Sequence, residues 1–347
     1  MIRIPLTKGW ASDMSYQPKR KIIIDTDPGV DDAFAIVTAL KYQGFEVVGI
    51  TTVAGNKGLD YVTKNALKLV GLLNADCMVY QGAHAALKDL DKPVDQSKDA
   101  GNTHGFDGLG GIKLPYDLSR LSEQSAVDYI LATVEQYPNE VEIMALGPLT
   151  NIALAIQTEP ELMKKVKTIW SMGGGVYRGN VTPVAEFNYW FDAESAQITY
   201  SIGQDVDIYM FGLDVTYQTY FTANDFFFIK QEGGELGRHF YDMVQDYADS
   251  YWKNRRITGA VIHDLVPVIY AIDPTISNPE DVYHCAVSVS CEPGLVHGQT
   301  VVDLVDRHNY LKNSYVVINA DDRKFKEVFM EIVFGEVADL YKKYVVS

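Results

Sequence analysis

Four aspartates stand within eight residues near the start of the chain, in the run DTDPGVDD: Asp25, Asp27, Asp31 and Asp32. Apolar residues flank this run on both sides, so its carboxylates are expected next to the protein core. Two like charges about 4 Å apart repel by on the order of 4 kcal/mol at an effective dielectric constant of about 20. Protonation would remove this repulsion, and so would a hard divalent cation such as Ca²⁺, which prefers carboxylate oxygens.

An ordinary explanation covers part of the run. An aspartate often caps the N-terminus of a helix, which would account for Asp31 or Asp32 on a solvated loop. The first two aspartates stay unexplained, because they directly follow an apolar strand. Pro28 keeps the residue before it out of the helical region, and Gly29 allows backbone angles that other residues avoid. The run therefore predicts a tight turn that gathers four carboxylates at the end of a strand.

The elements that must position this turn alternate between strands and helices through the first two thirds of the chain. Strands are expected at residues 21–25, 45–52, 78–81, 141–145, 168–172 and 206–211. Helices are expected at residues 31–42, 59–73 and 149–156 and from an N-cap at Ser122 to about residue 136, with a long loop over residues 88–120. In the last third, helices are expected over residues 224–254 and 321–344, and strands at 285–289 and 315–318.

This alternation predicts an α/β fold with an open, mostly parallel, doubly wound sheet flanked by helices. Ligands of such sheets bind beyond the carboxyl ends of the strands, where the acidic run falls. The sequence contains no repeat and no linker, so we predict a single domain over residues 21–347. Residues 1–20 are predicted to be an N-terminal extension, with a mixed composition that is compatible with disorder.

Composition narrows the possible function classes. The chain has 347 residues, of which 47% are hydrophobic, and this is enough for a large core. Its net charge of −16 argues against nucleic acid as a partner, which would require a basic patch, and against an anionic membrane surface. No apolar run reaches the roughly 18 residues of a membrane span. The first 20 residues lack a secretory segment, and the three cysteines form no metal-binding pair, so we expect a cytoplasmic location.

Several blocks of the chain resemble the inosine–uridine-preferring nucleoside hydrolase family. The run DTDPGVDD is similar to the signature of that family, and the other blocks follow in the family's order over roughly residues 21 to 330. These blocks are TVAGN at residues 52–56, HGFDGLGG at 104–111, LGPLTN at 146–151, MGGGVYRGNVTPVAEFN at 172–188 and the pair His263–Asp264. The resemblance implies hydrolysis of the N-glycosidic bond of ribonucleosides to ribose and free base, with a bound Ca²⁺.

The resemblance also implies a set of metal ligands. Asp27, Asp32, Asp264 and the backbone carbonyl of Leu146 match the positions that hold the ion. Asp27 also matches the base that removes a proton from the attacking water, and a bound Ca²⁺ would lower the pKa of that water. Asp25 matches a position that supports the site without contacting the substrate.

Other matched positions concern the substrate. The ribose-binding positions are Asp31, Asn56, Asn180, Glu186 and Asn188. His263 matches a residue of the base pocket that acts on the leaving group, and His104 and Tyr251 are further pocket candidates. The chemistry suits these residue types, because a negative charge such as that of Glu186 stabilises a ribosyl group with oxocarbenium character. Amide side chains can both donate to and accept from a diol, and a proton donor helps the base to leave.

Each of these residues also has an ordinary explanation. Asn180 and Asn188 on their own would be turn residues in most proteins. His263 lies in an apolar stretch where a lone histidine is usually a satisfied core residue, and Asp264 could be the N-cap of the next helix. Tyr251 fits the apolar face of a helix. Two buried polar residues side by side at positions 263 and 264 need a reason, and a metal supplies one.

Two alternative functions stay open from the sequence. The first is a Mg²⁺-dependent phosphatase or phosphotransferase of the DxD type, with Asp25 as the nucleophile. The Pro-Gly pair and two further aspartates after the DxD motif are untypical of that class. The second is a nucleoside-binding homologue that has lost catalysis, although every expected carboxylate is present.

Further properties cannot be decided from the sequence. His263 resembles the branch of the family that accepts both purine and pyrimidine nucleosides, but relatives differ in this preference. The family forms homodimers and homotetramers, and the sequence is compatible with either. Arg178 lies within the longest block without an evident role. The loop around residues 88–110 is expected to close over the substrate.

Overall fold

The isoleucines that precede the acidic turn form the central strand of the fold. The structure is a computed structural model that describes residues 18–92, 103–307 and 309–345. The strand β1 (Arg20–Thr26) pairs in parallel with β2 (Phe45–Thr52) on one side and with β4 (Val141–Ala145) on the other. Both faces of β1 are covered, so its isoleucines are fully buried. The acidic turn therefore starts in the middle of the sheet, at its carboxyl edge.

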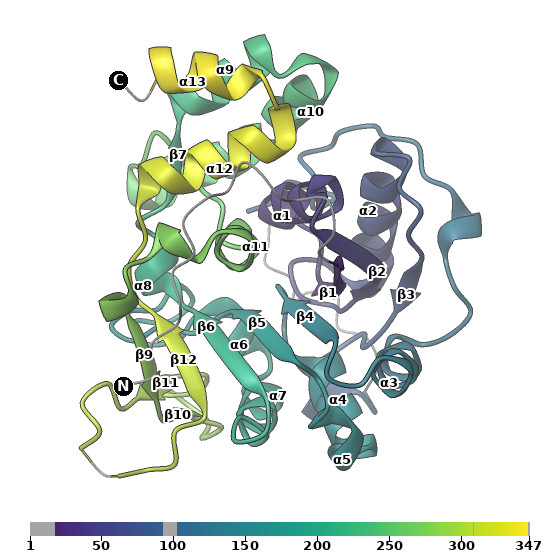
Figure 1. The fold of residues 1–347 in the computed structure, drawn as a ribbon, viewed down its shortest axis with the longest axis vertical. Coiled ribbons are helices and arrows are strands. Elements are labelled where there is room, and N and C mark those ends of the chain that lie inside the picture. Colours follow the sequence, from purple (N-terminus) through teal and green to yellow (C-terminus); the bar gives the residue numbers. More distant parts are fainter. Residues whose placement is uncertain (1–17, 93–102, 308, 346–347) are drawn as a thin grey trace.

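The central sheet has eight strands in the order β3-β2-β1-β4-β5-β6-β12-β9 (Figure 1). All neighbouring pairs are parallel except the last, in which β9 runs antiparallel to β12. The predicted α/β fold with an open, mostly parallel sheet is confirmed. The strands not yet named are β3 (Val79–Gln81), β5 (Thr168–Met172), β6 (Asp207–Phe211), β9 (Val282–Cys285) and β12 (Ser314–Val317).

Helices cover both faces of this sheet and enclose two hydrophobic cores (Figure 1). One core is built with α1 (Val30–Lys41), α2 (Leu59–Leu72), α10 (Gly234–Arg255), α11 (Leu265–Ile272) and α12 (Asp322–Phe334). The other is built with α3 (Ala126–Gln136), α4 (Thr150–Thr158) and α7 (Ala193–Tyr200). Helices on both faces are what a doubly wound sheet requires, because each parallel crossover must bury an apolar stripe.

The remaining elements are short, apart from the ten-residue helix α9. The remaining helices are α5 (Pro160–Met163), α6 (Phe187–Phe191), α8 (Leu213–Thr216), α9 (Ala223–Glu232) and α13 (Val337–Tyr344). Two small antiparallel sheets pair β7 (Tyr220–Thr222) with β8 (Gly259–Val261) and β10 (Val287–Val289) with β11 (Thr300–Val302). The 3₁₀ turns are η1 (Leu87–Asp89), η3 (Leu118–Arg120), η4 (Pro274–Ile276) and η5 (Pro279–Asp281).

Several predicted ends shift by one or two residues, and three predicted elements differ from the structure by more than that. The helix expected after Ser122 begins at residue 126, because the side chain of Ser125 accepts the capping N–H of Asp128. The strand expected at residues 285–289 is two strands in different sheets, β9 and β10. The final helix is interrupted at Gly335, whose φ of 59° is left-handed and separates α12 from α13.

Other predictions concern residues that the structure describes only in part. Most of the N-terminal extension predicted at residues 1–20 lies outside the described residues, and so does the middle of the loop expected to close over the substrate. That the chain forms a single domain stays a prediction. Within the described ranges, no helix combines the length and the apolar composition that crossing a membrane requires.

Candidate active site

Asp25 lies beneath the carboxyl edge of the sheet. Its side chain is fully buried, and its Oδ1 accepts hydrogen bonds from Thr51 Oγ1 at 2.5 Å and from Asn151 Nδ2 at 2.8 Å. Burial raises the pKa of this carboxyl to about 6. Asp25 is not among the residues that line the large cavity above it. A nucleophile must reach its substrate, so this position disfavours the DxD alternative and agrees with a supporting role.

Asp32 is fixed at the first turn of α1. Its Oδ2 accepts the N–H of Gly29 at 2.8 Å and a hydrogen bond from Asn56 Nδ2 at 3.2 Å, and Thr26 donates its hydroxyl to Oδ1. The side chain is fully buried. A carboxylate is favourable here because the N-terminus of a helix carries partial positive charge. Two donors from the acidic turn and one from the loop after β2 therefore hold Asp32 in one orientation.

Asp32 forms a cluster with two other acidic residues, Asp31 and Asp264. Each of the three offers one carboxylate oxygen, and these oxygens lie within 4.8 Å of one another. Burial, with the neighbouring carboxylates, raises the pKa of Asp31 to about 7 and that of Asp264 well above its usual value. Among the described residues, none donates a hydrogen bond to the buried Asp31 Oδ1, although His104 Nδ1 lies 3.6 Å from it. A hard divalent cation with oxygen ligands fits this arrangement.

Asp264 is not the ordinary helix cap that the sequence left open. It occupies the N-cap position of α11, but its side chain makes no capping hydrogen bond and instead faces the acidic cluster. It also lines the cavity. The carboxylate of Asp264 therefore remains available to bind a ligand, because it does not cap the helix.

Asp27 lies at the cavity beside this cluster without belonging to it. Its Oδ2 accepts the backbone N–H of Asn56 at 2.6 Å. A Cβ added at Gly55 or at Gly147 would collide with its carboxylate, so these two glycines allow the chain to close around it. Burial, and next the charge of Asp32, raises the pKa of Asp27. In this conformation the structure groups Asp31, rather than the predicted ligand Asp27, with Asp32 and Asp264.

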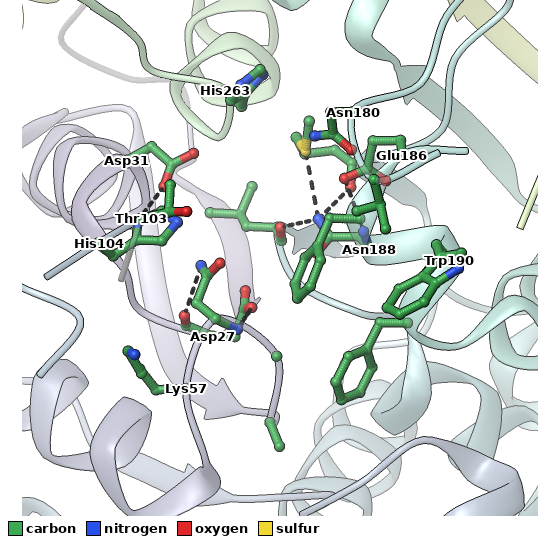
Figure 2. Close-up of a pocket in the computed structure, with 18 of the residues that line it drawn as sticks. Asp27, Asp31, Lys57, Thr103, His104, Asn180, Glu186, Asn188, Trp190 and His263 are labelled. Carbon is green, nitrogen blue, oxygen red and sulfur yellow. Dashed lines mark hydrogen bonds and ion pairs between the residues drawn. The ribbon is translucent and has the colours of Figure 1, made fainter. Parts of the chain in front are cut away.

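The ribose positions predicted on the longest sequence block form a second group across the cavity. Figure 2 shows Asn180, Glu186 and Asn188 together, on the side opposite Asp31 and His104. The carboxylate of Glu186 caps α6, because it accepts N–H groups from Asn188 at 2.8 Å, Gly174 at 2.9 Å and Tyr189 at 3.2 Å. Burial nevertheless raises the pKa of Glu186 to about 7.

Two asparagines connect these side chains to the strand ends: Asn56 on the side of the acidic cluster, and Asn188 on the side of the ribose positions. Asn188 Nδ2 donates to the carbonyl of Leu146 at 2.9 Å, which is the carbonyl predicted to bind the metal. Asn56 Nδ2 donates to the Asp27 carbonyl and to Asp32, each at 3.2 Å. Both side chains therefore organise the carboxyl edge of the sheet, and both line the cavity.

His263 lies between two hydroxyl groups. Its Nε2 is 2.7 Å from the Tyr251 hydroxyl and its Nδ1 is 2.8 Å from Thr216 Oγ1. Burial, followed by the charge of Arg255, lowers the pKa of His263 to about 3, so the imidazole is neutral. A neutral imidazole donates from one nitrogen and accepts at the other, which suits transfer of a proton along the row of three side chains.

His104 belongs to the same end of the cavity. Its Nδ1 accepts the N–H of Val30 at 3.1 Å, and its ring stacks on Tyr247 with centroids 4.8 Å apart. Burial and the charge of Lys57 lower the pKa of His104 to about 3. Because Nδ1 accepts a hydrogen bond, the proton of the neutral ring is on Nε2.

All the predicted site residues except Asp25 and Asp32 line one cavity of about 1100 Å³. Sequence analysis missed several other lining residues, among them Lys57, Tyr217, Tyr247 and Arg255. The spacing of Tyr247 could have identified it, because it lies four residues before Tyr251 on the same face of α10. No pattern in a single sequence predicts that Tyr217 lies at this cavity.

Arg178, whose role the sequence left undecided, packs at the edge of this site. Its guanidinium lies 5.4 Å from the centre of the Tyr217 ring and 4.0 Å from Asp214. The guanidinium of Arg255 lies 5.0 Å from the same ring, so two cations hold Tyr217 in place. Tyr217 in turn meets the ring of His263 edge-on, with centroids 5.4 Å apart.

Known proteins resemble this chain over nearly its whole length. The profile of the family described as inosine-uridine preferring nucleoside hydrolase matches residues 22–327. A pyrimidine-specific ribonucleoside hydrolase, RihB, from Escherichia coli is 34% identical over 92% of this chain and 98% of its own length.

Two solved structures have the same fold. A plant nucleoside hydrolase, the PpNRh1 enzyme, superposes with a TM-score of 0.84 and 30% identity, over 91% of this chain and 99% of its own. A purine-preferring ribonucleoside hydrolase from Gardnerella vaginalis superposes with a TM-score of 0.83 and 30% identity, over 92% and 100% of the two chains.

Proposed function

The chain belongs to the inosine-uridine preferring nucleoside hydrolase family, and from this premise we propose how its residues perform the family's reaction. The protein is an N-glycosyl hydrolase that cleaves ribonucleosides to ribose and free base. The acidic cluster at the carboxyl edge of the sheet supports the assignment of roles that follows. In particular, Asp31 Oδ1 is buried at the cavity and accepts no hydrogen bond from the described residues.

We propose Ca²⁺ as the cofactor. Asp32 and Asp264 would hold the ion, with Asp27 and the Leu146 carbonyl beside them and Asp31 turned toward the substrate. The residues fit such an ion, because they offer only oxygen ligands and bury several carboxylates close together. Ca²⁺ bound there would lower the pKa of the attacking water and would bind a diol of the ribose.

The protein's own residues then act on the substrate from two sides. Asp27 accepts the proton of the attacking water, and Asp31 accepts hydrogen bonds from the ribose diol. Asn180, Glu186 and Asn188 contact the opposite side of the sugar. The carboxylate of Glu186 stabilises the positive charge that develops on the ribosyl group as the bond to the base breaks.

At the base end, the row formed by Thr216, His263 and Tyr251 moves a proton to the departing base. Because the pKa of His263 is low, the ring does not store this proton. It releases a proton from one nitrogen while the other accepts one, and the hydrogen bonds of 2.7 and 2.8 Å provide the route. His104 and Tyr247 form a stacked wall that fits a planar base.

We also propose a broad base preference, because the cavity is large and the relatives differ. One relative is named as pyrimidine-specific and another as purine-preferring. A cytoplasmic location agrees with three free cysteines. Assembly into a homodimer or homotetramer agrees with exposed apolar side chains such as Leu295, Val305 and Leu311.

A single assay tests this function against its alternatives. The protein is incubated with inosine, uridine and a phosphate ester, with and without EDTA, and reducing sugar and phosphate are measured. We expect sugar from both nucleosides, no phosphate, and loss of activity with EDTA. Phosphate release without sugar would favour the DxD phosphatase, and binding of inosine without turnover would favour the catalytically silent homologue.

A further inference from the structure

The one-turn helix α8 is firmly anchored to the central sheet. It follows β6 directly, and all four of its residues are buried. Gln218, just after the helix, donates from Nε2 to the carbonyl of Asp214 and to the carbonyl of Ile318, each at 2.8 Å. Because Ile318 directly follows β12, these bonds tie α8 to two neighbouring strand ends. Side chains on α8 therefore start from a fixed backbone.

The carboxylate of Asp214, in the first turn of α8, binds a different segment of the chain. Its Oδ2 accepts the N–H of Val176 at 2.5 Å, and its Oδ1 accepts the N–H of Tyr177 at 3.2 Å. A short acidic side chain at the start of a helix often accepts an N–H of its own helix, but α8 has no such side-chain cap. Hydrogen bonds to an ionised acceptor are roughly twice as strong as neutral ones, so Asp214 is a strong anchor for this segment.

The segment that Asp214 holds belongs to the loop between β5 and α6, which carries the proposed ribose contacts. Before the anchor, the N–H of Gly174 donates to Glu186 Oε2 at 2.9 Å. After it, the N–H of Asn180 donates to the carbonyl of Ala185 at 3.0 Å, and Figure 2 shows the Asn180 side chain beside Glu186. A shift of residues 176–177 would therefore displace Asn180 and disturb the surroundings of Glu186.

The same turn of helix also reaches the base end of the site. Thr216, two residues after Asp214, is fully buried, and its Oγ1 lies 2.8 Å from His263 Nδ1. The ring of Tyr217 meets the His263 ring edge-on, and the guanidinium of Arg178 lies 5.4 Å from the centre of the Tyr217 ring. One short helix thus contacts the ribose loop through Asp214 and the imidazole through Thr216.

We propose that Asp214 is a positioning residue for the ribose, an inference that rests on the proposed function. Asp214 does not line the cavity, so it acts on the substrate through the loop it holds. Its carboxylate keeps the amide of Asn180 in contact with the sugar, while Thr216 on the same turn orients His263. Such support matters because a misplacement of about 1 Å can lower an enzymatic rate by about 10²-fold.

A double-mutant cycle with Asn180 tests the proposal in the Ca²⁺-loaded protein. Asp214→Ala should lower kcat/KM for inosine by about 10²-fold, and Asp214→Asn, which keeps one acceptor oxygen, should lower it less. In an Asn180→Ala background the Asp214 substitutions should cost less than about tenfold, because the amide that Asp214 positions is already absent. If Asp214→Ala does not fold, Asp214→Asn carries the cycle. Asp207→Asn, at the exposed opposite end of β6, is the matched control.

The leaving group separates the two contacts of α8. Inosine and p-nitrophenyl riboside share the ribose, so Asp214→Ala should lower kcat/KM for both by a similar factor. Thr216→Val, which removes the hydroxyl beside His263, should lower it for inosine alone, because p-nitrophenol leaves without a proton. Loss confined to inosine in Asp214→Ala would place its effect at the base end and reject the proposed role.

Two further outcomes would overturn the proposal. Equal factors for Asp214→Ala with and without Asn180 would show that the carboxylate acts independently of that amide. An unchanged kcat/KM would show that the bond from the N–H of Leu213 to the carbonyl of Gly174 suffices to hold the loop.

Failure of the proposed function gives a different result, because the wild type would then not hydrolyse inosine. Calorimetric titration with ribose repeats the cycle without turnover. Asp214→Ala should weaken the binding of ribose when Asn180 is present and leave it unchanged when Asn180 is replaced by alanine. Absence of ribose binding in the wild type would overturn both the proposed function and the role of Asp214.

Discussion

At the scale of single residues, the position of Asp27 depends on what surrounds it. Its carboxylate lies at the cavity, receives the N–H of Asn56 at 2.6 Å, and is enclosed by glycines that leave no room for a side chain. This leaves one oxygen for a ligand or for water. The side chain can therefore serve both as a ligand beside the acidic cluster and as the base that accepts a proton.

Asp27→Asn tests this assignment. An amide has nearly the same shape but accepts no proton from water at neutral pH, so we expect turnover of inosine to fall by about 10³-fold or more, as for loss of a general base. Steady-state release of reducing sugar measures the effect. Asp339→Asn, at an exposed position on α13, should leave the rate unchanged. Near-normal turnover of the Asp27 variant would refute its role as the base.

Tyr251→Phe tests the row of hydroxyl and imidazole groups at the base end. The variant loses the hydroxyl that lies 2.7 Å from His263 Nε2, and kcat for inosine should fall by about 10²-fold because the base leaves without a proton. A riboside with p-nitrophenol as its leaving group needs no such proton, so its rate should change little. Equal loss for both substrates would mean that Tyr251 acts only by packing.

Residues within contiguous sequence blocks were predictable, whereas residues brought by tertiary contact were not. The aspartates of the first turn and the trio of Asn180, Glu186 and Asn188 each stand close together in the sequence, and the structure brings Asp27, Asp31 and the whole trio to the cavity. Tyr217 and Lys88 reach the cavity only through packing. The sequence also could not foresee that Asp31, rather than Asp27, groups with Asp32 and Asp264.

At the scale of elements, one buried amide joins three strand ends. Asn151 Nδ2 donates to Asp25 Oδ1 at 2.8 Å, near the end of β1, and to the carbonyl of Thr52 at 3.1 Å, at the end of β2. Its Oδ1 accepts the N–H of Ala83, after β3, at 2.8 Å. The relative positions of these strand ends therefore depend on a single side chain at the start of α4.

Asn151→Ala should destabilise the protein by about 2–4 kcal/mol, because it removes one hydrogen bond each from the buried Asp25 carboxylate, the Thr52 carbonyl and the Ala83 N–H. The midpoint of urea unfolding should fall, and inosine turnover should fall with it, since the turn that carries the site loses its support. Asn224→Ala, at an exposed position on α9, provides the matched control. Unchanged stability would show that another contact positions these strand ends.

Strands that are buried on both faces were the easiest elements to predict. The predicted ranges 45–52, 141–145 and 168–172 agree with β2, β4 and β5 residue for residue, because an apolar run between turn residues has few alternatives. The ends of helices were harder to predict than these strands. Ser122 and Ser125 are both plausible caps in the sequence, and only the hydrogen bond from Asp128 to Ser125 decides between them.

At the scale of the whole molecule, the buried carboxylates couple stability to pH and to metal. Without metal, the pKa of Asp31 rises to about 7, and those of Asp27, Asp32 and Asp264 rise as well. A raised pKa means that the folded protein binds these protons more tightly than the unfolded chain does. Their contribution to stability is therefore present below about pH 4 and is lost as the pH rises through about 7.

The increase in Tm that Ca²⁺ produces over EDTA should therefore grow between about pH 5 and pH 8, because the ion replaces protons that the site loses over this range. Differential scanning calorimetry measures it. His104 and His263, whose pKa values are lowered, make the opposite contribution to the pH dependence of stability. This contribution cancels when the Tm in EDTA is subtracted from the Tm in Ca²⁺ at the same pH. Asp264→Asn should reduce the shift strongly. A Tm shift that does not change with pH would contradict the carboxylate cluster as the binding site.

The central claim is that the acidic turn holds a divalent cation that the cleavage of ribonucleosides requires. The most direct measurement is release of reducing sugar from inosine by chelator-treated protein, followed as Ca²⁺ is added back. We predict no turnover without metal and full recovery at one bound ion per chain. Full turnover by protein that elemental analysis finds free of divalent metal would contradict the account.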